Sequence, residues 1–142
     1  RLMGAPSQPE RWQRIVSTPD EGIRLAEAAL VIAAEEYPGL DVDAYLARIE
    51  AMGADLRKRL RQDITPTETI IALNRYVFEE LGFSGNAEAY YDPRNSFLNE
   101  VIDRRLGIPI TLSMIYIEIG RRVGLALHGV SFPGNFLVKC VV

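Results

Sequence analysis

The chain has 142 residues, of which 48% are hydrophobic and 25% charged, and its formal net charge at pH 7 is −3. This composition is typical of a globular domain that can bury a core, and it excludes a disordered chain. The slight negative charge gives no indication of a broad surface for nucleic acid or anionic membrane, and no apolar run reaches the roughly 18 residues that span a bilayer. Cys140 is the only cysteine, which excludes an internal disulfide and favours a cytoplasmic protein.

The first part of the chain is predicted to be helical. Residues 1–18 have few periodic apolar positions and are expected to form a loose N-terminal segment. Residues 19–83 are predicted to form a layer of helices, because apolar residues recur there at helical spacing. The first helix is expected to end at the sequence YPG (37–39), and the second to cover residues 41–61.

The third helix has the clearest start signal. Thr65 is predicted to be the N-cap, Pro66 the first helical residue, and Glu68 the residue that completes a capping box. Gly82 is expected to end this helix in a left-handed conformation.

Residues 84–142 are predicted to form a second unit around one central helix. It is expected to begin with a turn at 84–86 and a short helix over 94–105, which Gly107 ends. The next helix starts behind Pro109 and is apolar on most sides, so we expect it to be the most buried one.

Two strands are predicted to follow the central helix. They cover 126–132 and 135–142 and are joined by the Pro133–Gly134 turn. Because a two-stranded ribbon is weak alone, we expect a third strand beyond Val142 and therefore a unit that is truncated at its C-terminus. The fold class predicted from the whole pattern is α+β and predominantly helical.

Thr111 and Ser113 are the first candidates for chemistry, because both lie at the start of the predicted central helix. The free N–H groups and partial positive charge of a helix start activate a nucleophile and stabilise an oxyanion. A hydroxyl nucleophile also needs a nearby base. Hydroxyl side chains at helix starts are commonly caps, so a structural role for Thr111 is the favoured interpretation.

His128 and Cys140 are weaker candidates. His128 is the only histidine and is a candidate general base, although a lone strand histidine is more often structural. Cys140 alternates with Val138 and Phe136, so we expect the three to share one strand face and Cys140 to act as a small hydrophobic residue. One histidine and one cysteine do not predict a zinc site, and no cofactor is expected.

A polar set surrounds the short helix. Asp92 lies near arginines, and ion pairs or capping explain it. Asn95 and Asn99 are four residues apart on one predicted helix face, and two amides at this spacing are suited to holding the backbone of a loop.

The sequence YYDPRNSFLNEVIDRRLGIPITLSMIYIEIGRRVGLALHGVSFPGNFLVK (90–139) resembles the transglutaminase-like domain of the bacterial SirB family. That family's pattern is approximately D-x-x-N-S-x-L-N-x-V, then R-R-x-G-I-P-I-S/T-L-S, then G-L-x-x-x-G-V-x-x-P-G-H-F-L-V. The residues that meet it are Asp92, Asn95, Ser96, Leu98, Asn99, Arg104, Arg105, Gly107, Pro109, Thr111, Leu112, Gly124, Gly129, Pro133, Gly134 and Phe136.

The resemblance implies a transglutaminase-like or papain-like core, with a central helix packed on an antiparallel sheet. In active relatives a cysteine starts that helix, and a histidine and an acid lie on the strands; SirB-type proteins commonly have a hydroxyl residue in place of the cysteine. Asn135 replaces the histidine of the pattern, and asparagine does not accept a proton at neutral pH. The third catalytic position would lie beyond Val142.

These observations predict a catalytically inactive transglutaminase-like domain of a bacterial protein. We expect it to act as a protein-binding, scaffolding or regulatory module, with an unidentified protein partner rather than nucleic acid or membrane. The resemblance also implies helical repeats in the C-terminal part of the full-length protein. The alternative is a peptidase-like or amidase-like hydrolase or acyltransferase that uses Thr111 or Ser113, or Cys140, with His128 as its base.

Overall fold

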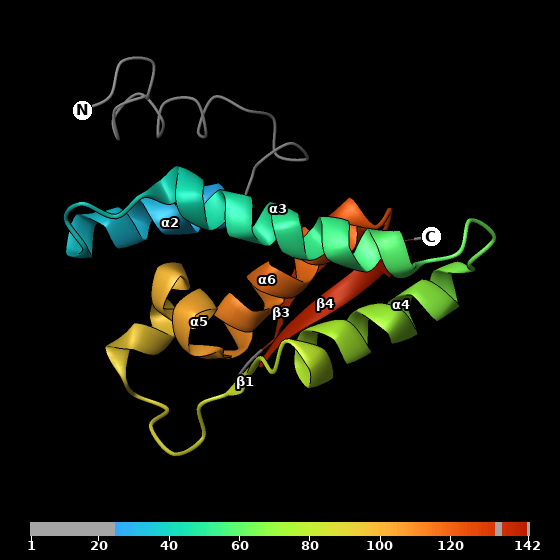
Figure 1. Ribbon diagram of the computed structural model, residues 1–142. Coiled ribbons are helices and arrows are strands. Elements are labelled where there is room, and N and C mark those ends of the chain that lie inside the picture. Colours follow the sequence, from blue (N-terminus) through green and yellow to red (C-terminus); the bar gives the residue numbers. More distant parts are fainter. Residues whose placement is uncertain (1–24, 133–134, 142) are drawn as a thin grey trace.

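The computed structural model describes residues 25–132 and 135–141, except for the side chains of Ala126 and of residues 128–141. Helices make up most of this part of the chain, and a small antiparallel ribbon follows them (Figure 1). In chain order the elements are α2 (Leu25–Glu36), α3 (Val42–Arg59), α4 (Pro66–Asn74), the π-helix η2 (Arg75–Glu80), β1 (Ser84–Gly85), the 3₁₀-helix η3 (Pro93–Ser96), α5 (Leu98–Arg104), β2 (Leu106–Gly107), α6 (Pro109–Arg122), β3 (Ala126–Phe132) and β4 (Asn135–Val141). The predicted α+β class with a helical layer, a central helix and a short sheet is confirmed.

The predicted start and stop signals of α4 and η2 are present. The Thr65 hydroxyl accepts the Glu68 N–H at 3.1 Å, and the Glu68 carboxylate accepts the Thr65 N–H at 3.2 Å, so the capping box is complete. Gly82 has a φ of 76°, as predicted for a left-handed cap. The prediction of a single α-helix was wrong, because it continues as the π-helix η2. There the Leu81 N–H donates to the Tyr76 carbonyl, five residues back, at 2.8 Å.

Two further predictions of local structure were wrong. The segment expected to be one helix over 94–105 consists of η3 and α5, and Arg105, with a φ of 64°, ends α5 in place of Gly107. The expected turn at 84–86 contains β1, which pairs in parallel with β2. This pairing joins segments more than twenty residues apart, and hydrophobic periodicity within a short window does not indicate it.

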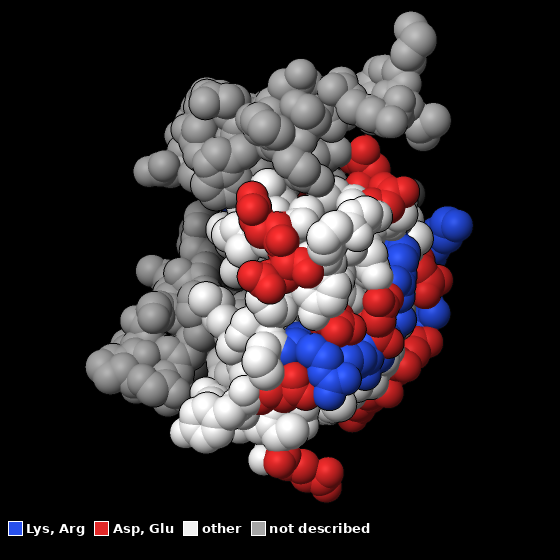
Figure 2. All heavy atoms as spheres, turned by 90° about the vertical axis from the view of Figure 1, so that its left-hand side faces the viewer, with Lys and Arg blue, Asp and Glu red and all other residues white. Residues whose placement is uncertain are grey.

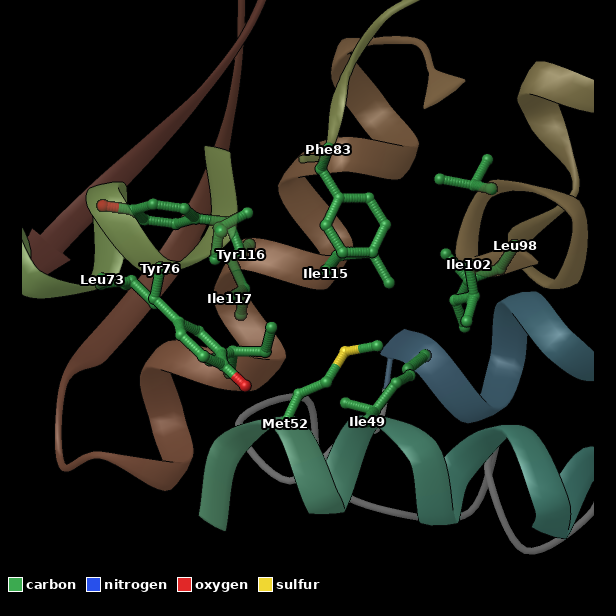
Figure 3. Packing of buried hydrophobic residues seen from close by; sticks show 14 of the residues in the cluster. Ile49, Met52, Leu73, Tyr76, Phe83, Leu98, Ile102, Ile115, Tyr116 and Ile117 are labelled. Atoms are coloured by element: carbon green, nitrogen blue, oxygen red, sulfur yellow. The ribbon is translucent and has the colours of Figure 1, made fainter. Parts of the chain in front are cut away.

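Helix α6 lies in the middle of the molecule, with α3 across one side and the β3–β4 ribbon on another (Figure 1). It also contacts α2, α4 and α5, so it has helical or strand neighbours on nearly every side. Figure 3 shows how its apolar side chains meet those of the surrounding elements. One cluster of buried residues forms this core. It includes Phe83, which lies between η2 and β1, together with Ile49 and Met52 of α3, Leu73 of α4, Tyr76 of η2, Leu98 and Ile102 of α5, and Ile115, Tyr116 and Ile117 of α6.

Close packing around α6 depends on two glycines. A Cβ atom on Gly120 would lie 2.2 Å from a methyl carbon of Leu127, and one on Gly53 would lie 2.5 Å from the Arg122 stem. Both distances are shorter than any ordinary contact, so β3 packs on Gly120 and the Arg122 stem packs on Gly53 of α3 because neither glycine has a side chain.

The predicted division of the chain at residues 83 and 84 stays a prediction, although both parts share this core.

The β3–β4 ribbon is antiparallel, as predicted, with Phe132 opposite Asn135 and His128 opposite Lys139. None of the helices in the described residues is both long and apolar enough to cross a lipid bilayer.

We expect Ile117→Ala to lower the free energy of unfolding by about 2–5 kcal/mol, because its side chain is completely buried in the core and truncation leaves a cavity. Ile71→Ala is the matched control, since Ile71 is 49% exposed on α4, and it should change stability by less than about 1 kcal/mol. Urea unfolding followed by circular dichroism measures both. Equal effects of the two substitutions would contradict the central position of α6.

Candidate functional site

The start of α6 carries a buried hydroxyl. Ile108 is the N-cap in an extended conformation, Pro109 takes the first helical position, and Thr111 takes the third. The Thr111 hydroxyl accepts the Ile108 N–H at 3.1 Å and lies 2.8 Å from the Asn95 carbonyl, to which it donates. The Ile108 carbonyl is a further neighbour at 3.1 Å. Because Ile108 has no acceptor in its side chain, only one of the two bonds of a capping box is made here.

The hydroxyl therefore both donates to and accepts from backbone groups. Thr111 is 3% exposed, and its single proton and one of its lone pairs are engaged in hydrogen bonds. In this arrangement Thr111 joins the first turn of α6 to η3. Within the described residues, all hydrogen-bond partners of the hydroxyl are backbone groups, and no side chain that could serve as a base is among them.

Asn95 organises the loop that precedes α5. Its side chain is buried, and its amide group donates to the carbonyls of Ala89 at 2.8 Å and Tyr90 at 3.1 Å. Its side-chain oxygen accepts from the Asn86 amide at 3.0 Å, and the Asn86 oxygen accepts the Ala89 N–H at 3.2 Å. Two buried amides thus hold the loop closed with their own hydrogen bonds satisfied.

Asn99, the second amide of the predicted pair, differs from Asn95. It is 5% exposed, and its side-chain oxygen has no hydrogen-bond partner in the described part of the chain. It therefore takes no part in closing the loop through this oxygen.

The β1–β2 pair places this loop against α6. The Ser84 N–H donates to the Arg105 carbonyl and the Asn86 N–H to the Gly107 carbonyl, each at 3.0 Å. A Cβ atom on Gly107 would lie 2.8 Å from the Thr111 hydroxyl oxygen and 3.0 Å from a methyl carbon of Val101. Glycine is thus required at 107 by close approach, at the point where the strand pair meets the start of α6.

Arg105 is held by local contacts. Its guanidinium carbon lies 4.8 Å from the ring centre of Phe83, and its side chain donates to the Leu81 carbonyl at 3.4 Å. Desolvation by burial lowers the pKa of Arg105. Its left-handed backbone ends α5 and turns the chain into β2.

Asp92 caps η3 and binds Arg94. Its carboxylate accepts the Arg94 N–H at 3.0 Å, and the guanidinium of Arg94 reaches both carboxylate oxygens at 2.6–3.1 Å. Arg104 lies 3.7 Å from the same carboxylate. The hydrogen bonds from the Arg94 side chain and backbone lower the pKa of Asp92 to about 2.

The other sequence candidates are only partly placed. Ser113 is 7% exposed on α6. The strand register puts the backbone of Asn135 beside the turn and that of His128 further from it. The side chains of His128, Asn135 and Cys140 lie outside the described residues, and so do their distances to Thr111. Among the residues that the structure describes, no group of three His, Cys, Asp or Glu side chains is suited to hold a metal ion.

The sequence did not predict two features of this region: the hydrogen bond of Asn86 and the close contact at Gly107. Asn86 was interpreted as a turn residue, and its hydrogen bond to Asn95 joins positions whose spacing follows no helical or strand period. Gly107 was interpreted as the end of a helix. Its place directly before an Ile-Pro pair is the one signal in the sequence that points to a backbone segment lying against a helix start.

A central helix packed between helices and an antiparallel ribbon is the core expected from the resemblance to transglutaminase-like domains. Residues 43–142 match the model of the family described as Transglutaminase-like superfamily, and the chain belongs to this superfamily.

Curated relatives give a finer comparison. The chain is 46% identical over 131 residues to a UPF0162 protein of Xylella fastidiosa, which covers 92% of the chain and 47% of that protein. It is 33% identical over 115 residues to a UPF0162 protein of Pseudomonas aeruginosa, with 81% of the chain and 42% of that protein covered. The chain thus spans about half the length of these relatives.

A more distant relative is the human F-box only protein 21. It is 37% identical over 73 residues, which cover 51% of the chain and 12% of that protein. No solved structure matches the chain.

We expect Thr111→Val to lower the free energy of unfolding by about 1–3 kcal/mol, because it keeps the shape of the side chain but leaves the buried Asn95 carbonyl and Ile108 N–H without this partner. Thr111→Ser should retain most of the stability. Thr67→Val, at an exposed position of α4, is the control for the substitution itself. Urea unfolding at neutral pH measures all three, and a Thr111→Val variant as stable as the wild type would show that the hydroxyl is not a structural link.

The carboxyl group of Asp92 should titrate near pH 2. Because its folded-state pKa lies below the ordinary 3.8, its interactions contribute stability above pH 3.8 that is lost as the pH falls toward about 2. A carbon-13 NMR titration of the Asp92 carboxyl measures this directly. We expect Arg94→Gln to raise the pKa toward 3.8 and Arg57→Gln, at an exposed position of α3, to leave it unchanged. An ordinary pKa in the wild type would contradict the Asp92–Arg94 geometry.

Proposed function

We propose that the chain is a catalytically inactive transglutaminase-like domain that acts as a protein-binding, scaffolding or regulatory module. The observation that carries the proposal is the state of Thr111. Its hydroxyl lies at the helix start where a nucleophile of this fold would be, yet it is buried and bonded to the Asn95 carbonyl and the Ile108 N–H. Among the side chains that the structure describes, no base lies within hydrogen-bond reach of this hydroxyl, and its burial opposes contact with a substrate.

The sequence supports the same proposal independently. Asn135 stands where the SirB-type pattern has a histidine, and an amide does not act as a general base. We also propose the finer assignment to the SirB-type proteins, with the chain forming the transglutaminase-like part of a longer cytoplasmic bacterial protein. The chain covers about half of its UPF0162 relatives, so partner binding belongs to the full-length protein in this proposal.

The alternative function is a hydrolase or acyltransferase with Thr111, Ser113 or Cys140 as nucleophile and His128 as base. It requires the Thr111 hydroxyl to leave the Asn95 carbonyl, or a different nucleophile to be used. The buried network at 86–95 opposes the first requirement, because opening it would leave buried amide and carbonyl groups unpaired.

We expect no turnover of an ester, a peptide amide or a glutamine-plus-amine pair above the rate given by Thr111→Val. The assay follows release of nitrophenol, of a peptide fragment and of ammonia from the full-length protein. His128→Gln and Cys140→Ser are run beside it, because they test the base and thiol of the alternative. Wild-type turnover that is lost in His128→Gln, and also in either Thr111→Val or Cys140→Ser, would overturn the proposal of an inactive domain.

Partner binding is tested in the same preparation. The full-length protein is isolated under native conditions from its own cells, together with a form that lacks this domain. We expect to recover a stoichiometric protein partner only when the domain is present. Identical recovery by both forms would contradict a binding role for the domain.

A further inference from the structure

A groove lies between α2 and α3, beside the first residue that the structure describes. It contains a cavity of about 350 Å³, to which Ala26, Leu46 and Ala47 contribute apolar walls. The rest of its lining is charged and consists of Glu27, Asp43, Glu50, Glu118 and Arg122. Figure 2 shows a face of the molecule on which basic side chains lie directly beside acidic ones, whereas the groove has four carboxylates to one guanidinium.

Two of these carboxylates are matched by arginines of the described fold. Glu118 lies within ion-pair distance of Arg121 and Arg122, and Arg122 also donates to Glu50 at 2.6 Å. Glu118 is 5% exposed, so it belongs to the wall of the groove and is closed to an occupant. What the groove binds is therefore decided by its other two acids and its apolar walls.

Glu27 and Asp43 carry the remaining negative charge of the lining. They lie on different helices, α2 and α3, and each takes part in an interaction. Glu27 is only 7% exposed, and a carboxylate that is buried to this extent is stable beside a cation or several hydrogen-bond donors. The groove is therefore suited to an occupant that combines cationic groups with apolar surface.

The chain itself contains a segment of this chemistry just ahead of α2. Residues 11–16 have the sequence RWQRIV, with two arginines and no acidic residue. Trp12, Ile15 and Val16 supply apolar surface. Eight residues join Val16 to Leu25, the start of α2, and such a connection spans at most roughly 30 Å. A tether of this length gives the segment a high effective concentration at the groove, so even a weak contact is populated.

The similarity to a relative reaches into this segment. The UPF0162 protein of Xylella fastidiosa matches 131 residues of a chain of 142, so residues 12–24 lie within the matched stretch wherever that stretch begins. The shared stretch thus starts well ahead of α2. This extent favours a segment that belongs to the domain over one that only links it to something else.

We infer that residues 11–16 bind in the α2–α3 groove of their own chain, with the Trp12 indole in the cavity and the two arginines beside its carboxylates. A cavity of this size is at the lower limit for a small-molecule site and takes a single large side chain. An indole combines an apolar body with one N–H donor, which matches aliphatic walls with carboxylates at their edge. The inference is independent of the proposed partner binding, because the contact lies within one chain.

Trp12 reports on its own position, since it is the only tryptophan of the chain. In the fluorescence of the full chain, we expect its emission at shorter wavelength than that of N-acetyltryptophanamide. Quenching by acrylamide should be several-fold weaker, because the indole is out of contact with water. Emission and quenching equal to those of the free amide, in a chain whose circular dichroism shows folded helices, would overturn the inference.

Two matched variants locate the indole. Ala47 is exposed at the cavity, so Ala47→Arg places a long cation where Trp12 is expected without altering the core. Quenching of Trp12 should rise several-fold, toward the value of the free amide. Ala54→Arg makes the same substitution at another exposed position of α3, outside the lining, and should leave the quenching unchanged. Equal quenching in the two variants would contradict the placement of Trp12 in this groove.

A reversal of charge within the segment tests the ionic part of the contact without altering the described fold. Arg14→Glu should raise the quenching of Trp12, because it brings a carboxylate toward the acidic lining. Arg1→Glu makes the same change outside residues 11–16 and should leave the quenching unaltered. Equal effects of these two reversals would contradict a contact between the segment and the carboxylates of the groove.

Discussion

The apolar character of α6 on nearly all its sides is the constraint on which the rest of the structure depends. A helix of this kind is stable only when other elements cover its apolar sides, and α2, α3, α4, α5 and the β3–β4 ribbon all contact it. The absence of a side chain at Gly53 of α3 leaves room for the Arg122 stem of α6, and its absence at Gly120 of α6 leaves room for Leu127 of β3. These glycines let α3 and β3 lie in direct contact with α6.

The two ends of α6 solve the same problem of buried polar groups in different ways. At the start, Thr111, Asn95 and Asn86 satisfy one another and the local backbone, so the region is closed and self-sufficient. Toward the end, the buried Glu118 carboxylate lies within ion-pair distance of Arg121 and Arg122, and Arg122 in turn donates to Glu50. The start of α6 thus bonds neutral amides, a hydroxyl and backbone groups, whereas its end pairs charges.

Much of this arrangement could be predicted from the sequence where the signals are local. The Thr65–Glu68 capping box, the left-handed Gly82, the buried α6 and the pairing of β3 with β4 all follow from residues that are close along the chain. The β1–β2 pair and the Asn86–Asn95 bond could not be predicted, because they depend on how distant segments meet. The widening at η2 and the left-handed Arg105 were missed for the same reason: packing overrode local preference. The sequence identified the polar residues between 92 and 111. It could not decide whether the Thr111 hydroxyl is structural or catalytic, because that depends on its hydrogen-bond partners.

The parallel pairing of β1 with β2 closes the intervening segment at its base. Residues 84 and 106 lie side by side, so the chain leaves the α4–η2 arm and returns to the start of α6 at nearly the same place. The enclosed segment is tied to the core as well as closed at its base. The Asn95 amide binds the carbonyls of Ala89 and Tyr90, and α5, which lies in the same segment, contributes Leu98 and Ile102 to the core. A change of chain length around residues 87–91 would therefore have to preserve these contacts to leave the start of α6 in place.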